Sequence, residues 1–77
     1  MYTVYAIKSL DDGRIYVGLT SDLIRRLKEH NGGKTKSTKG YMPWKLIYKE
    51  EVETRLIARE REKYWKSGIG KEKLKTL

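Results

Sequence analysis

Two phenols, a guanidinium, an imidazole and a carboxylate lie along the sequence on segments that we expect to be half buried. They are Tyr5, Tyr16, Arg26, His30 and Glu62. Cleavage of a phosphodiester needs a base for the attacking water, a fixed cation for the charge that develops on phosphorus, and a carboxylate for a hard cation such as Mg²⁺. The residue types therefore favour hydrolysis of nucleic acid if the fold brings these side chains together.

The two tyrosines lie on a predicted β-hairpin. Residues 2–9 and 14–20 are rich in Tyr, Val, Ile and Thr, and the turn signal Asp12-Gly13 lies between them. Side chains alternate between the two faces of a strand, so any loop with an even number of residues places Tyr5 and Tyr16 on the same side of the sheet. The pattern predicts a pair of neighbouring phenols.

Two further features complete the predicted sheet. Gly18 falls on the same face as Tyr16 and removes a side chain there, which is typical of a bulge or of a close approach by another backbone, and indicates a need for room beside Tyr16. A third strand begins just after Pro43 and ends near Val52. Along this strand, Trp44, Leu46 and Tyr48 alternate with Lys45, Ile47 and Lys49.

Arg26 and His30 lie on the first predicted helix, over residues 22–30. Thr20 or Ser21 is expected to cap this helix, and a run of Asn and Gly ends it. Arg26 and His30 then stack one turn apart along a border of the apolar arc. We expect Leu23, Ile24 and Leu27 to be buried and Arg25, Lys28 and Glu29 to face water.

Glu62 lies on the second predicted helix. Thr54 caps this helix, which continues to Lys66 and ends at Ser67-Gly68. Glu62 falls at the edge of a buried stripe that consists of Ile57, Ala58, Tyr64 and Trp65. Residues 70–77 are expected to form one more short helical piece.

Composition limits the class of protein. A chain of 77 residues supports one domain, which we place over residues 1–77. The absence of cysteine excludes a disulfide framework and a thiolate metal site. Eighteen basic against ten acidic residues give a formal net charge of +8, which attracts anionic polymers such as nucleic acid. No apolar run approaches the roughly 20 residues that span a bilayer, so we expect a cytoplasmic protein with no membrane contact.

Taken in order, these motifs resemble the GIY-YIG nuclease domain, and in particular its small stand-alone bacterial members. The resemblance covers nearly the whole chain. It rests on Thr3-Val4-Tyr5, Tyr16-Val17-Gly18, Arg26, His30 and the late helical Glu62. It implies an α+β fold in the order β-β-α-β-α, with a three-stranded antiparallel sheet flanked by helices and a short C-terminal helical tail. It also implies a magnesium-dependent endonuclease site.

The resemblance implies a role for each site residue. Tyr5 and Tyr16 match the two motif tyrosines, one of which activates the attacking water with help from its neighbour, from His30 or from a metal-bound water. Which tyrosine does so is left open. Arg26 matches the arginine that steadies the scissile phosphate, and Glu62 matches the glutamate that holds Mg²⁺, for which Mn²⁺ can substitute. In-line attack then leaves a 5′ phosphate and a 3′ hydroxyl.

Several features leave the strength of catalysis open. Many family members place an asparagine after the metal-site helix, where this chain has Ser67-Gly68-Ile69-Gly70. Glu62 has the competing interpretation of an ion pair with Arg59 or Lys66, both within helical reach. His30 has the competing interpretation of a structural histidine.

A polar loop over residues 32–42 carries three lysines and no acid, namely Lys34, Lys36 and Lys39. Short polar loops of this kind are mobile. Lysines beside a phosphate site contribute affinity for the backbone of nucleic acid without reading its sequence, although they also serve as solubility charges. We expect the first of these roles.

Three functions are compatible with the sequence. The first is a metal-dependent endonuclease with little sequence specificity, acting on DNA rather than RNA as a monomer, with a specificity-giving protein partner left open. The second is a nucleic-acid-binding domain of the same fold with little or no turnover. The third is a protein-interaction module that uses Trp44, Trp65 and the tail as a contact surface.

Overall fold

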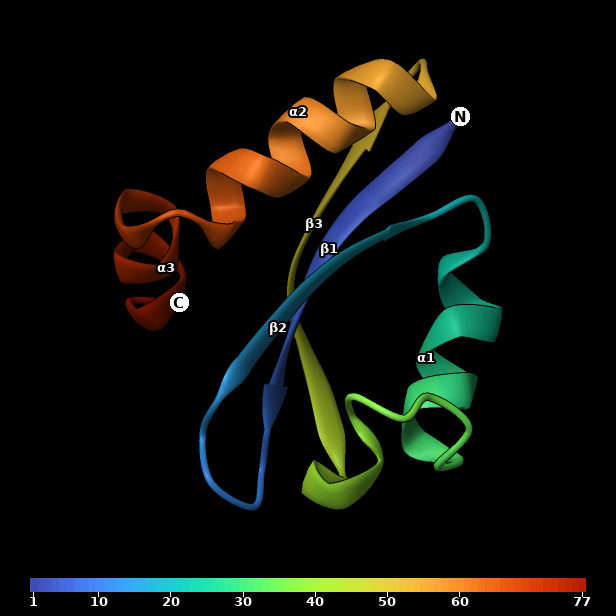
Figure 1. The fold of residues 1–77 in the computed structure, drawn as a ribbon, viewed down its shortest axis with the longest axis vertical. Coiled ribbons are helices and arrows are strands. Elements are labelled where there is room, and N and C mark those ends of the chain that lie inside the picture. Colours follow the sequence, from blue (N-terminus) through green and yellow to red (C-terminus); the bar gives the residue numbers. More distant parts are fainter.

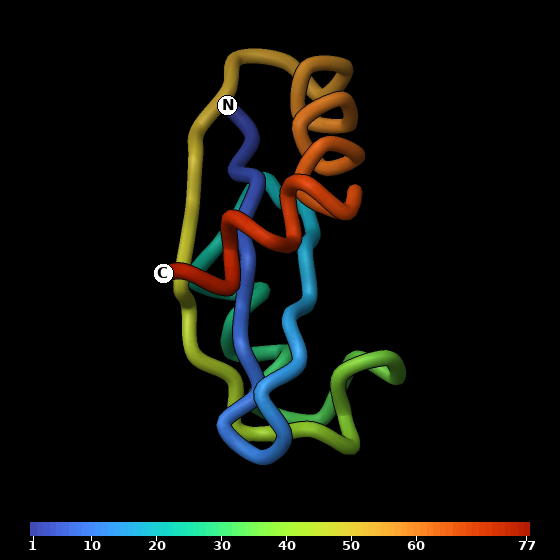
Figure 2. Tube along the Cα trace, turned by 90° about the vertical axis from the view of Figure 1, so that its left-hand side faces the viewer, coloured from blue at the N-terminus to red at the C-terminus, as the bar shows by residue number.

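Three antiparallel strands form the sheet on which the candidate site is built. The structure, a computed structural model, describes residues 1–77. Its strands are β1 (Tyr2–Ser9), β2 (Ile15–Thr20) and β3 (Trp44–Val52), arranged in the order β2-β1-β3. Figure 2 shows β1 running between its two neighbours. The predicted antiparallel sheet is confirmed.

Helices cover both faces of this sheet. They are α1 (Leu23–Asn31), the short 3₁₀ helix η1 (Lys39–Tyr41), α2 (Arg55–Lys66) and α3 (Gly68–Lys75). α1 lies on one side of the sheet, whereas α2 and α3 lie on the other (Figure 1, Figure 2). The α+β class and the C-terminal helical tail are confirmed, although the tail begins at Gly68 rather than at residue 70. None of the helices combines the length and the apolar character that crossing a membrane needs.

The hairpin pairs its two tyrosines on one face, as predicted. Ile7 lies opposite Tyr16 and two residues from Tyr5, so all three side chains point to the side that α1 covers. The pairing is centred between Asp11 and Asp12, one residue earlier than expected. Both ends of the loop move together, so the number of loop residues stays even and the shared face is retained.

β3 contains a β-bulge that the sequence pattern did not predict. Ala6 pairs with Tyr48 but Ile7 pairs with Leu46, so Ile47 is an extra residue without a partner in β1. The bulge changes which face the following side chains point to. Leu46 packs on the side of α1, whereas Tyr48 packs on the side of α2. The predicted alternation is therefore wrong beyond Ile47.

A hydrophobic cluster lies on each face of the sheet. Under α2 and α3 the buried members are Val4, Ala6, Val17, Ala58, Trp65 and Leu74. Toward α1 the buried members are Tyr5, Ile7 and Trp44, with Tyr16, Leu23 and Leu27 packed against them. The predicted phenols therefore belong to the α1 face, while Glu62 belongs to a helix that covers the opposite face.

The N-terminus of α1 is capped one residue later than the sequence pattern suggested. The side chain of Asp22 accepts a hydrogen bond from the backbone N–H of Arg25 at 3.1 Å, and Asp22 is the N-cap. Thr20 instead accepts from the backbone N–H of Asp22 at 3.0 Å. The prediction of Thr20 or Ser21 as the cap is wrong, because Thr20 completes β2 and its hydroxyl shapes the turn into the helix.

The buried stripe of α1 includes a polar residue, His30, which the sequence pattern placed only at the border of that stripe. His30 is fully buried, so the stripe runs through Leu23, Leu27 and His30 and leaves Ile24 70% exposed. Glu29 is half buried because it pairs with Arg26. The predictions of a buried Ile24 and a water-facing Glu29 are therefore wrong. On α2, the predicted burial of Ile57 is also wrong, since that side chain is 43% exposed.

α2 is fixed to β3 by one carboxylate. Thr54 caps the helix as predicted, accepting from the backbone N–H of Ile57 at 3.2 Å. Glu50 then accepts hydrogen bonds from Arg61 at 2.6 Å and from the Trp65 indole at 2.8 Å. The residue next to Arg61 is Glu62, so this anchor also sets the position of the predicted metal ligand.

Candidate active site

Three rings form the floor of the candidate site. Tyr5 and Tyr16 come from adjacent strands with ring centroids 6.5 Å apart, and His30 reaches them from α1. The imidazole lies 5.8 Å from Tyr5 and stands edge-on to Tyr16 at 5.1 Å. Tyr5 is 1% exposed and His30 is completely buried, whereas Tyr16 is half buried. Of the three rings, Tyr16 alone reaches the surface.

Gly18 makes room for this packing. It lies opposite Tyr5 in the hairpin, and a Cβ atom there would be 2.7 Å from the Tyr5 hydroxyl oxygen. The same atom would be 3.2 Å from a ring carbon of Tyr16. The need for room at Gly18 is confirmed, but the prediction of a bulge or an approaching backbone is wrong, because the group that approaches is the phenol of Tyr5.

A chain of buried hydrogen bonds leads away from Tyr5. Its hydroxyl is 2.8 Å from His30 Nε2, and His30 Nδ1 is 2.9 Å from Thr38 Oγ1. Thr38 Oγ1 in turn lies 3.3 Å from the backbone carbonyl oxygen of Thr35, to which it donates. His30 and Thr38 have no exposed surface, so these contacts are made without solvent.

Burial keeps both Tyr5 and His30 neutral. Burial raises the pKa of Tyr5 to about 12, outweighing the opposite effect of Arg26. Burial, and then the charge of Arg26, lowers the pKa of His30 below its usual value. Near pH 7 the pair is therefore a phenol hydrogen-bonded to an uncharged imidazole.

Arg26 lies beside the buried phenol and stays charged. Its guanidinium donates to the Glu29 carboxylate at 3.0 Å, and its side chain is 32% exposed. Burial opposes its charge, but the hydrogen bond with Glu29 and the contact with Tyr5 prevail, and the pKa of Arg26 is raised. The site therefore contains a fixed cation that is partly open to solvent.

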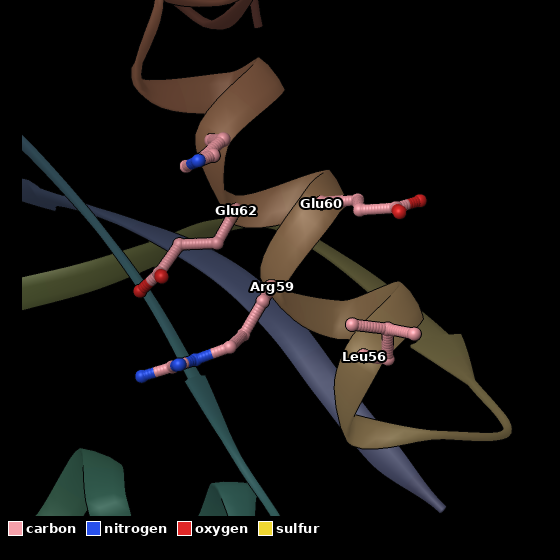
Figure 3. Close-up of a pocket in the computed structure, with 5 residues that line it drawn as sticks. Leu56, Arg59, Glu60 and Glu62 are labelled. Carbon is pink, nitrogen blue, oxygen red and sulfur yellow. The ribbon is translucent and has the colours of Figure 1, made fainter.

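Glu62 extends toward this site from α2, the helix on the opposite face of the sheet. Figure 3 shows Glu62 and Arg59 extending from the same side of α2 toward β2, whereas Glu60 points the other way. Glu62 lies close enough to the Tyr5 hydroxyl for its charge to raise the pKa of that group. Its carboxylate also pairs with Lys66 at 3.4 Å, so this competing interpretation is confirmed as a contact.

The Tyr5 hydroxyl is thus the common neighbour of the predicted site residues. Tyr16, Arg26 and Glu62 all act on its pKa, and His30 is hydrogen-bonded to it. These residues come from both strands of the hairpin and from helices on opposite faces of the sheet. The fold therefore packs Tyr5, Tyr16 and His30 together with Arg26 beside them, and Glu62 approaches this group from the helix on the opposite face.

The single carboxylate of the site suits a metal ion whose other ligands come from waters and substrate phosphates. No group of three or more His, Cys, Asp or Glu side chains gathers anywhere in the chain. Glu62 is a single carboxylate, and its side chain is 24% exposed. Mg²⁺ is commonly bound by one or two carboxylates together with waters and substrate phosphates. Glu62 fits such a partial site, with Lys66 as the group that must give way or share it.

Two hollows flank the site and are lined by arginines. One, of about 540 Å³, lies along α2 between Leu56, Arg59, Glu60, Glu62 and Lys63. The other, of about 270 Å³, lies where β2 leads into α1, and its basic residues are Arg25, Arg26 and Arg55. Arg25, Arg55 and Arg59 pair with no acidic side chain. These guanidinium groups are free to meet an anion.

The three loop lysines lie to one side of the site. Lys34, Lys36 and Lys39 are exposed, and Lys39 begins η1. Lys34 shares a hollow of about 290 Å³ with Arg25, Lys28 and Glu29. The loop is also anchored in the protein interior by the buried Thr38. The contact with nucleic acid predicted for these lysines would therefore be made by a loop that is fixed at its centre.

The structure adds Thr38 to the candidate site and excludes the contact surface predicted around the two tryptophans. No role was predicted for Thr38, because a threonine among Lys, Ser and Gly is typical of a solvated loop. Trp44 and Trp65 are 5% and 8% exposed and belong to the two cores. The interpretation of these tryptophans as a contact surface for a protein partner is therefore wrong.

Comparison with known proteins gives three informative matches. The chain is 38% identical over 78 residues to a UPF0213 protein of Clostridium perfringens, covering 100% of this chain and 83% of the relative. It is 37% identical over 51 residues to the structure-specific endonuclease subunit SLX1 of Homo sapiens, covering 61% of this chain but 18% of that protein. The solution NMR structure of a UPF0213 protein from Bacillus halodurans matches with a TM-score of 0.58 and 35% identity, covering 96% of this chain and 82% of the other.

The match to a family model is consistent with the geometry of the site. The model of the GIY-YIG catalytic domain covers residues 1–75, from the first strand through the last helix. It therefore includes every residue placed around the Tyr5 hydroxyl. A match of this extent, together with the resemblance to small bacterial relatives over their greater length, means that the chain belongs to the GIY-YIG nuclease family.

Proposed function

We propose that the protein is a metal-dependent endonuclease that hydrolyses phosphodiester bonds in DNA with little sequence preference. The observation that carries this proposal is the packing of Tyr16 and His30 against Tyr5, with Arg26 on the same helix as His30 and with Glu62 extending from α2 toward β2. Membership of the family supports nuclease chemistry, as does the similarity to a human structure-specific endonuclease subunit. The net charge of +8 supports a polyanionic substrate.

Each residue contributes one part of the reaction. Arg26 donates to the non-bridging oxygens of the scissile phosphate and stabilises the charge that builds there during in-line attack. Tyr16 is the phenol that meets the attacking water, since Tyr5 is covered. The new bond joins the water oxygen to phosphorus, and the bond to the 3′ oxygen breaks. A 5′ phosphate and a 3′ hydroxyl remain.

Glu62 would hold Mg²⁺ or Mn²⁺ at the edge of the hollow along α2. A divalent cation bound there supplies Lewis-acid stabilisation of phosphate charge and lowers the pKa of a water molecule. Glu62 would set the position of this charge, and Arg26 would supply a second, fixed positive charge for the same phosphate. Lys66 neutralises Glu62 when no substrate is present.

The unpaired arginines give the substrate a path across the molecule. Arg25 and Arg55 lie around the hollow that contains Arg26, and Arg59 lies beside Glu62. Guanidinium groups bind phosphates of the backbone, and such contacts position DNA without reading its sequence. Low sequence preference follows from this set of contacts. The loop lysines extend the same basic surface beside Arg25.

A cleavage assay with matched variants tests the proposal. Plasmid and labelled branched DNA are incubated with the protein and Mg²⁺ or Mn²⁺, and strand scission is followed over time. Glu62→Gln and Arg26→Ala should each lower kcat by about 100-fold or more. Glu53→Gln is the control, because Glu53 is exposed just before α2 and lines none of the three hollows. Cleavage that survives both site substitutions would mean a contaminating nuclease or a different active site.

Two observations favour a second candidate function, a nucleic-acid-binding domain with little turnover. Lys66 already satisfies Glu62 at 3.4 Å, and the segment after α2 contains no amide side chain to support a transition state. Under this alternative, DNA binds in a salt-dependent way without metal, and no cation produces cleavage. Glu62→Gln then leaves binding unchanged or improves it, because it removes a negative charge near the phosphates.

A further inference from the structure

We propose that Thr38 is a positioning residue for this site. Its hydroxyl holds His30 in one tautomer, and His30 in turn holds the Tyr5 hydroxyl against which Arg26 lies. Thr38 touches none of the reacting atoms and acts through two buried side chains. The kinetic consequence rests on the proposed nuclease function, whereas the tautomer does not.

The direction of each hydrogen bond follows from the acceptor at the end of the chain. The backbone carbonyl of Thr35 cannot donate, so the hydroxyl of Thr38 donates to it at 3.3 Å. The same hydroxyl oxygen then accepts from His30 Nδ1–H at 2.9 Å. An uncharged imidazole has one N–H, so Nε2 is left as an acceptor.

The acceptor at Nε2 fixes the orientation of the phenol. The Tyr5 hydroxyl donates its proton to Nε2 at 2.8 Å. The lone pairs of the Tyr5 oxygen are then turned away from His30 and toward the guanidinium of Arg26, which acts on this hydroxyl. In the opposite tautomer, Nε2–H would point at the Tyr5 oxygen, and the phenol proton would be directed at the cation instead.

Burial makes the arrangement depend on the hydroxyl of Thr38. Tyr5, His30 and Thr38 are exposed by 1%, 0% and 0%, so no water can replace a missing partner without a rearrangement. The backbone of Thr38 has a separate task, since its carbonyl accepts from the Trp44 indole at 2.9 Å. A substitution of the side chain therefore removes the link to His30 and leaves the hydrogen bond from Trp44 in place.

Three variants separate positioning from folding. Thr38→Val keeps the shape and removes the hydroxyl, Thr38→Ser restores a hydroxyl, and Ser37→Ala changes an exposed neighbour in the same loop. Imidazole ¹⁵N chemical shifts report the tautomer of the single histidine, and the Arg26 Nε–Hε signal reports the environment of the guanidinium. Both are measured at neutral pH without DNA, and circular dichroism checks that each variant is folded.

The expected results are specific. In the unaltered protein and in Ser37→Ala, His30 carries its proton on Nδ1. In Thr38→Val, a substantial Nε2–H population appears and the Arg26 Nε–Hε signal moves, whereas Thr38→Ser restores both. In the cleavage assay, Thr38→Val lowers kcat by about 10- to 100-fold, with little change in KM, and Thr38→Ser recovers most of it.

Other results overturn the inference. An Nε2–H tautomer in the unaltered protein, or a Thr38→Val variant with unchanged His30 and Arg26 signals, would show that Thr38 does not position the site. If Thr38→Val is unfolded, the same signals in Thr38→Ala and Thr38→Ser decide the question. Absence of any cleavage by the unaltered protein would remove the proposed function but leave the two spectroscopic outcomes as the test of Thr38.

Discussion

Burial separates two tyrosines that the sequence leaves equivalent. Tyr5 and Tyr16 both occupy strand positions on one face of the hairpin, and the motif alone does not say which of them contacts the attacking water. Tyr5 is 1% exposed and tied to His30, whereas Tyr16 is half buried and contacts the imidazole edge-on. We infer that Tyr16 is the phenol in contact with the reaction, and that Tyr5 organises the groups around it.

The burial of His30 predicts a loss of stability on acidification. Burial, and then the charge of Arg26, lowers the pKa of His30 in the folded protein, against a smaller opposing effect of Glu29. In the unfolded chain histidine titrates near its ordinary pKa of about 6.5, so below about pH 7 the unfolded state binds more protons than the folded state. The free energy of unfolding should therefore fall as the pH drops from about 7.5 to about 5.5. Urea unfolding at these two pH values measures the change.

A single substitution isolates this effect, because the chain has one histidine. His30→Gln should be less stable than the unaltered protein at the higher pH, since it disturbs a buried hydrogen-bonded pair. Its stability should nevertheless change less between the two pH values. An equal pH dependence in both proteins would assign the effect to carboxylates and contradict the buried, neutral state of His30.

The residues of the site were predictable to different degrees for physical reasons. The positions of Tyr5, Tyr16 and Gly18 follow from the period of two in a hairpin, and a small error in the turn does not disturb it. Thr38 could not be found in this way. Its burial depends on how α1 approaches a loop that begins after the helix ends, and no local pattern encodes that contact.

At the scale of elements, one carboxylate on β3 decides where α2 lies. Glu50 accepts from Arg61, Trp65 and the Tyr48 hydroxyl, and the hydrogen bond from Arg61 is the main reason why the pKa of Glu50 is lowered. Tyr48 can contribute because the bulge at Ile47 turns it toward α2. The bulge, the ion pair and α2 are therefore one structural unit.

Glu50→Gln tests this unit. The substitution removes the charge that Arg61 meets and weakens four hydrogen bonds, so stability should fall by about 1 to 2 kcal/mol, a range reduced for the partial exposure of Arg61. Mn²⁺-dependent cleavage should also decrease, because Glu62 follows Arg61 on the same helix. Glu51→Gln, at an exposed neighbouring position, is the control. Equal stability of the two variants would show that Glu50 does not anchor α2.

The elements that were predicted less well share one cause. Counting of apolar residues placed Ile24 and Ile57 inside, because it left the polar His30 at the border of its stripe. On α2 it put Arg61 within the stripe but could not identify the acid that pairs with it. In the structure these polar side chains take places on or beside the buried stripes, since each has hydrogen-bond partners from another element. The bulge at Ile47 likewise serves two cores on opposite faces, and a strand pattern read in isolation assumes one.

At the scale of the whole molecule, the net charge predicts binding to DNA but not where the DNA lies. The placement of cations suggests an answer, because Arg55 and Arg59 flank the site without acidic partners. Lys34 and Lys36 lie in the loop beyond α1. Ion pairing with phosphates releases counterions, so each phosphate contact adds a measurable amount to the salt dependence of binding.

Two double variants with the same loss of charge separate placement from net charge. Arg55→Gln with Arg59→Gln should reduce the slope of log affinity against log salt by about 2, the value for two lost contacts to B-DNA. Lys34→Gln with Lys36→Gln should reduce this slope by less, because these lysines lie farther from the candidate site along the basic surface. Fluorescence anisotropy with a labelled duplex, measured without divalent metal to prevent cleavage, gives both slopes. Equal slopes for the two pairs would mean that the DNA responds to total charge, and the path along the arginines would have to be abandoned.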